Sequence, residues 1–147
     1  MGGGSTRFLS ALIDSADEVV QASDLVQSFV IAASDETTAL TTGTNKVRFR
    51  MPYAFNLTEL PRASVSTAPA GSVITVDINA GASTPATILS TKLTIDAGEK
   101  TSVTASTPAV LSSTTLANDD IVTFDIDAVG SSTAGVGLKC ELIGFKL

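Results

Sequence analysis

The chain has 147 residues, a net charge of -6 and a pI near 4.4. That acidity argues against nucleic acid and anionic membrane surfaces as partners, because both attract clustered Lys and Arg. The sequence has one cysteine and no histidine, which excludes an intrachain disulfide and removes the commonest general base and metal ligand.

Charged residues make up only 16% of the chain, against about 25% in an ordinary soluble domain. Ser, Thr and Ala take their place. Since surface charge keeps protein molecules apart, this composition favours a surface that packs against other protein. The length is that of one domain with a single core.

Residues 1–27 differ from the rest of the chain because they are acidic and lack both proline and strand alternation. Apolar residues recur there at helical spacing, which predicts an arm, partly helical or extended, that docks on a partner. The alternative is a flexible terminus, but so many apolar side chains are costly to leave in water. The candidate interface residues of this arm are Phe8, Leu9, Leu12, Ile13, Val19 and Val20.

The sequence after the arm shows the alternation and turn signals of short β-strands. An apolar run at 28–33 is followed by 46–51, where apolar residues alternate with Lys and Arg. The stretch 55–65 predicts another strand, which Pro61 interrupts at a bulge or an edge position. Further strands are predicted at 73–78, 88–95, 121–128 and 136–142.

The stretch 101–113 is rich in Ser and Thr and offers Val103 and Val110 as possible anchors in the core, while 116–120 predicts a turn. About seven or eight short strands with turns between them predict an all-β domain over 28–147. We expect an antiparallel β-sandwich, jelly-roll-like in its connections.

No motif in the sequence predicts catalysis. Ser and Thr are abundant, but no histidine is present to activate them, and neither Ser-x-x-Lys nor Gly-x-Ser-x-Gly occurs. Cys140 alternates in phase with Leu138 and Leu142, which places it in the core. We therefore expect no enzyme activity, no cofactor and no metal. A carbohydrate-active hydrolase on the same fold is a weaker alternative, because the groups for acid–base chemistry are missing.

Aspartates on the predicted strand faces raise the question of a cation. Asp77 and Asp125 would come together if their strands were neighbours, and carboxylate oxygens are the ligands that calcium prefers. The sequence lacks the Asp-x-Asp-x-Asp-Gly loop. Solvated carboxylates on an outward face are therefore the favoured interpretation.

Five stretches of the sequence carry a family resemblance. They are residues 34–43 (SDETTALTTG), 47–55 (VRFRMPYAF), 62–69 (RASVSTAP), 76–79 (VDIN) and 88–96 (ILSTKLTID). The pattern resembles a recurrent module in structural proteins of tailed bacteriophages, and it spans roughly residues 29–144. The arm is not part of the module.

The resemblance implies a β module without an active site that forms symmetric oligomers, often homotrimers, on the virion. We expect a capsid decoration (cement) protein that binds the major capsid protein, or other virion proteins, and stabilises the phage head after assembly in the host cytoplasm. The alternative is a tail-fibre, neck or adaptor subunit that contacts the host surface.

Overall fold

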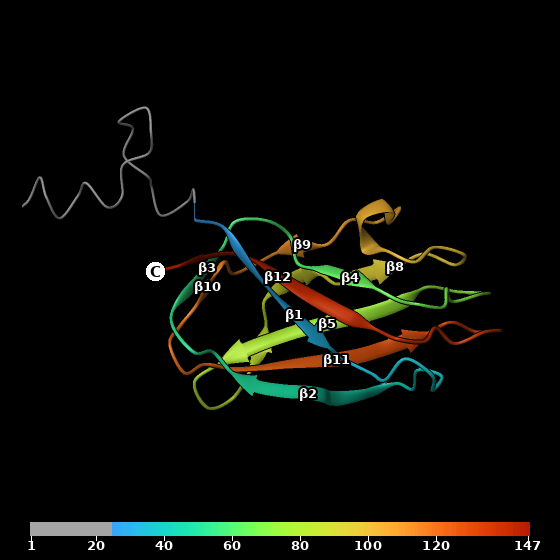
Figure 1. Ribbon diagram of the computed structural model, residues 1–147, viewed down its shortest axis with the longest axis horizontal. Helices are drawn as coiled ribbons and strands as arrows, with labels where there is room; N and C mark the ends of the chain where they lie inside the picture. The colour runs from blue at the N-terminus through green and yellow to red at the C-terminus, as the bar shows by residue number, and fades with distance from the viewer. Residues whose placement is uncertain (1–24) are drawn as a thin grey trace, which may run out of the picture.

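The computed structural model of the protein describes residues 25–147, which form two antiparallel β-sheets packed face to face (Figure 1). In Figure 1, β1 and β12 run obliquely across β5 and β11. The predicted all-β antiparallel sandwich is confirmed. The arm's interface candidates lie outside the described residues, so its docking stays a prediction.

The first sheet is built around β12 (Lys139–Lys146). β1 (Gln27–Ala32) pairs along one side of β12, and β3 (Phe55–Leu57) and β4 (Arg62–Ser64) share the other side. β10 (Thr115–Leu116) extends the sheet beyond β3. β1 and β10 are therefore the outer strands of this sheet.

The second sheet is built around β11 (Ile121–Val129), which lies between β2 (Gly43–Arg50) and β5 (Ile74–Gly81). β5 pairs in turn with β6 (Ala86–Thr87) and with β8 (Leu93–Ile95). β2 is the free edge strand at one side of this sheet.

A small third sheet joins β7 (Leu89–Thr91) to β9 (Val110–Leu111), and the short 3-10 helix η2 (Ser102–Thr104) lies between β8 and β9 in the chain. The prediction of one strand over 88–95 is wrong. The chain pairs with β9 before Lys92 and with β5 after it, so the run divides at that residue.

Apolar side chains from both sheets fill the space between them. The predicted inward alternation is confirmed in β5, β11 and β12, where apolar residues at alternate positions are buried because successive side chains of a strand point to opposite faces. The fully buried side chains of the two central strands and β5 are Val122, Phe124, Ile126, Cys140, Leu142, Ile74, Val76 and Ile78.

Two residues, Leu116 and Thr123, are buried although the sequence pattern places them outside the core. The turn expected over 116–120 is confirmed for 117–120, where the Asp120 N–H donates to the Ala117 carbonyl at 3.2 Å, but Leu116 belongs to β10 and is fully buried against the core. Thr123 alternates with the inward-facing Val122 and Phe124, yet it is buried. Its strand, β11, has a paired strand on either side. Thr123 lies directly opposite Arg48 of β2 and Asn79 of β5, so the longer side chains of these cross-strand neighbours cover it on a face that the alternation alone assigns to water.

Candidate interaction surface

A hollowed, partly apolar band crosses the surface on both sides of β4. It consists of two adjoining hollows that share Arg62 and Val103. The larger, of about 340 Å³, lies between the 58–61 loop and η2. The smaller, of about 180 Å³, lies between Val30 of β1 and η2. The band therefore leads from the β1 edge to the far side of β4.

The 58–61 loop forms one wall because the chain leaves the sheet there. Leu57 lies opposite Gly144 and Arg62 opposite Glu141, so four residues of the loop face only residues 142–143 of β12. The two extra residues of the loop bulge outward, as expected from the proline at position 61. The bulge leaves the Leu60 side chain exposed.

The other wall is η2, which is joined to β4 by a hydrogen bond from the Ala63 N–H to the Ser102 hydroxyl at 2.9 Å. Thr101 caps η2, because its hydroxyl accepts from the Val103 N–H at 3.2 Å. With Ser102 held against β4, the Val103 side chain is 63% exposed. The prediction that Val103 and Val110 anchor the core is wrong, because both are exposed on short elements at the periphery.

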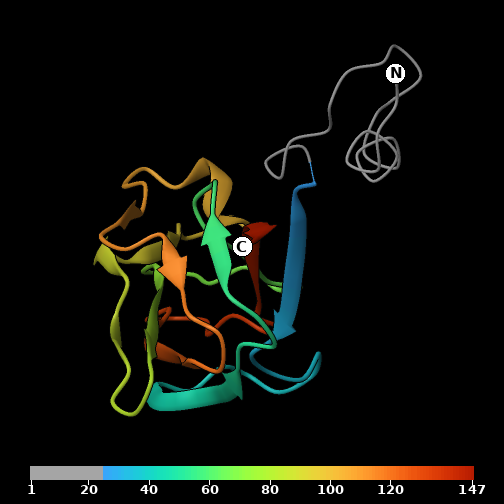
Figure 2. The ribbon, with the colours of Figure 1, turned by 90° about the vertical axis from the view of Figure 1, so that its left-hand side faces the viewer.

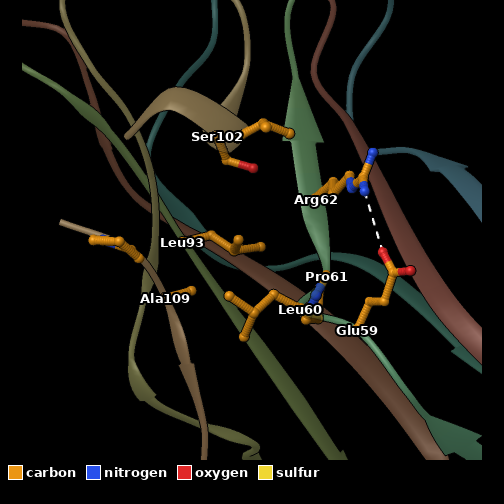
Figure 3. A pocket seen from close by; sticks show the side chains of 9 residues that line it. Glu59, Leu60, Pro61, Arg62, Leu93, Ser102 and Ala109 are labelled. Atoms are coloured by element: carbon orange, nitrogen blue, oxygen red, sulfur yellow. Dashed lines mark hydrogen bonds and ion pairs between the residues drawn. The ribbon is translucent and has the colours of Figure 1, made fainter. Parts of the chain in front are cut away.

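The floor of the larger hollow is apolar. Figure 3 shows Leu60, Leu93 and Ala109 facing the cavity, whereas the Glu59–Arg62 ion pair, 3.1 Å long, lies on the outer side of β4. An exposed ion pair of this kind adds little stability. The hollow can therefore bind an apolar side chain at its centre while the charged groups at its rim remain solvated, as in protein interfaces.

The edge strand β1 carries the band to the flank of the molecule. Val30 is 61% exposed on the outer face. On the inner face, Phe29 packs against the rings of Phe55 and Tyr53 at centroid distances of 5.1 and 5.9 Å, yet it remains only half-buried. β1 is thus attached to the core without being covered by it.

A polar cluster lies on the opposite sheet. The Lys92 ammonium is 2.6 Å from the Asp127 carboxylate and 3.3 Å from that of Asp77. The Thr87 hydroxyl donates to the Asp77 carboxylate at 2.5 Å. Hydrogen bonding to Asp127, with a smaller contribution from Asp77, raises the pKa of Lys92. The Lys92 ammonium group is therefore the cation that these two carboxylates bind.

This arrangement bears on the cation question. β5 and β11 are neighbours and Asp77 lies opposite Asp125, as the sequence allowed. Asp77 is buried, however, so the prediction of a solvated carboxylate is wrong for it. Asp125 accepts hydrogen bonds from the Asn45 N–H and the Asn79 amide. Within residues 25–147, no group of three or more His, Cys, Asp or Glu residues is placed to hold a metal ion.

Cys140 is buried in the core, as its phase with Leu138 and Leu142 predicted. Burial raises the pKa of its thiol to about 12, so the thiol stays protonated at neutral pH and lacks the thiolate that nucleophilic chemistry needs.

Leu60 and Val30 were not predicted to be surface residues. The exposure of Leu60 could have been inferred from its position beside Pro61, inside an interrupted strand. Nothing in the sequence around Val30 indicates that its side chain is exposed.

Among the residues that the structure describes, no helix has the length and hydropathy needed to cross a membrane. The chain matches no protein-family model, no curated protein and no solved structure.

Proposed function

We propose that the chain is a non-enzymatic structural subunit of a tailed-phage particle, a capsid decoration protein that attaches to the assembled head through the hollowed band. The observation that carries the proposal is the continuity of exposed apolar groups from Val30 across Val103 to Leu60. That the partner is a phage head is inferred from the sequence resemblance.

The band has the composition expected of a docking surface. Its centre is apolar, its rim carries Arg62 and Lys139, and the Lys139 ammonium is already paired with Glu36. Burying Val103 and Leu60 against a partner would remove apolar surface from water, which contributes about 25 cal/mol per Å². A subunit that binds only the assembled shell stabilises that shell by mass action.

The experiment is a count of copies per particle, by quantitative mass spectrometry of purified virions of the phage that encodes the chain. A copy number comparable to that of the major capsid protein supports decoration of the head. A small number set by the symmetry of the neck or tail supports the alternative, a tail-fibre, neck or adaptor subunit. Absence from the virion contradicts both.

A substitution in the hollowed band tests whether the copy number per particle depends on that surface. Val103→Asp places a charge in the shared wall of the hollows, and Val110→Asp places one at a similarly exposed valine that lines neither of them. Both variants should fold, since each position is already exposed. We expect V103D to be depleted from particles and V110D to be incorporated normally. Full incorporation of V103D would exclude the band as the docking surface.

A further inference from the structure

The sandwich has two long free edges, and they differ in chemistry. On β2, Lys46, Arg48 and Arg50 stand exposed at alternate positions, and the pairing with β11 is irregular between Phe124 and Ile126. Cations and bulges of this kind prevent an edge from pairing with another chain. The β2 edge is therefore protected.

β1 has no such protection. Its sequence, QSFVIA, contains no charged residue and no proline, and its pairing with β12 is continuous from Gln27 to Ala32. Among residues 25–147, no strand pairs with the other side of β1. Figure 2 shows β1, in blue, at the flank of the molecule with no described strand beyond it. A regular, uncharged edge is a template for strand addition.

The hydrogen-bond pattern shows which groups face outward. The Ala33 N–H donates to the Leu138 carbonyl at 2.8 Å, at the end of the β1–β12 ladder. Because backbone groups of an antiparallel strand alternate between its two sides, the N–H and C=O groups of Ser28, Val30 and Ala32 point away from β12. These residues supply a row of donors and acceptors for another strand.

The inner face of β1 also lacks a complete cover. Phe29 and Ile31 point toward the core, yet both remain half-buried, and no strand within residues 25–147 lies outside them. A strand added at this edge would place its own inward side chains beside these two and extend the apolar layer. Strand addition would thus satisfy backbone groups and bury apolar surface together.

We propose that the β1 edge is a self-association site, at which β1 of one copy pairs antiparallel with β1 of a second copy around a two-fold axis. In the register centred on Val30, this residue faces the partner's Val30 and Ser28 faces the partner's Ala32. All of these are residues with outward-facing backbone groups, so the contact forms about six hydrogen bonds. On the inner face, Phe29 comes to lie beside the partner's Ile31.

A second copy fits this edge because the edge is complementary to itself. The outward residues are small or β-branched and uncharged, so no like charges meet across the axis. An isologous contact repeats each favourable pair and closes after two subunits. The inference concerns the isolated protein and does not rest on the phage assignment. It differs from the trimer that the resemblance implies.

The test is the mass of the full-length protein in solution, by sedimentation velocity over a range of micromolar concentrations. We expect a dimer. Val30→Lys brings two ammonium groups together at the axis and should raise the dissociation constant at least about tenfold. Val30→Thr, which is β-branched and uncharged, should retain the dimer. Val110→Lys serves as the control for an added surface charge.

A cross-link tests the register. Val30→Cys should form an intermolecular disulfide on mild oxidation, since residues facing each other in such a pair have Cα atoms about 5.5 Å apart. Val110→Cys should not, and the native Cys140 is buried. A monomer at every concentration, a trimer, a dimer unaffected by V30K, or equal cross-linking of both variants would overturn the inference. Each of these results leaves the copy number per virion unaffected.

Discussion

Replacing Lys92 by Met should destabilise the domain, because it leaves the Asp77 carboxylate buried without its counter-charge. The Asp77 side chain is 9% exposed and would keep the Thr87 hydroxyl as its hydrogen-bond donor. Breaking a fully buried ion pair costs about 3–5 kcal/mol, whereas an exposed pair contributes about 1 kcal/mol or less. The Lys92 side chain is 44% exposed, so water replaces part of the interaction and the expected loss is about 1–3 kcal/mol.

Urea unfolding at pH 7, followed by circular dichroism, measures that loss as a shift of the midpoint at constant slope. Lys100→Met is the matched control, since Lys100 is exposed, and it should change stability by about 0.5 kcal/mol or less. Asp77→Asn in the K92M background removes the buried charge and should restore part of the loss. A K92M variant as stable as the wild type, or a double variant less stable than K92M, would refute the reasoning.

The pH dependence of the same variant has a definite sign. The pKa of Lys92 is raised above 10.5 in the folded protein, so the stabilisation is complete below that pH and is lost as pH rises through the folded value. The difference between wild type and K92M should therefore persist at neutral pH and shrink in strong alkali. A constant difference across that range would assign the effect of the substitution to packing.

Two further substitutions test the core. Burial raises the pKa of Cys140 from 9.0 to about 12, so the unfolded chain releases that proton first and stability should fall as pH rises through this window. In Cys140→Ala the decline, measured by urea unfolding at several pH values, should be shallower, and an unchanged decline would contradict the assignment. A side chain at Gly144 would overlap the Asn56 carbonyl of β3, so Gly144→Ala should cost about 3 kcal/mol or more; a loss below about 1 kcal/mol would show that β3 moves freely.

The strands that lie at the centre of the sheets were predictable from local alternation. Ile74, Val76 and Ile78 recur at every second position, as do Val122, Phe124 and Ile126, and burial on one face requires that spacing. The interruption at Pro61 was also predictable, because proline cannot donate to a ladder. These features depend on residues that are neighbours in sequence.

The candidate surface depends on tertiary contacts and was less predictable. Val103 is apolar and was assigned to the core, but it is exposed beside Ser102, which is hydrogen-bonded to Ala63, 39 positions away. The division of the 88–95 run at Lys92 reflects contacts with Asp77 and Asp127 in other strands. No pattern within a single segment contains that information.

The two edges illustrate the same limit. The cations of β2 and the uncharged sequence of β1 are visible in the sequence, but their meaning depends on which strands lie at an edge. That order is set by pairing between distant segments, such as β1 with β12 and β2 with β11. Once the order is known, the charge pattern alone distinguishes the protected edge from the open one.

The most direct test of the proposed function is a three-dimensional reconstruction of the purified phage particle. We expect the β-sandwich to lie on the outer surface of the head, with the hollow lined by Leu60 and Val103 turned toward the shell and filled by a side chain of the capsid protein. A sandwich located on the tail, or one on the head with this hollow open to solvent, would contradict it.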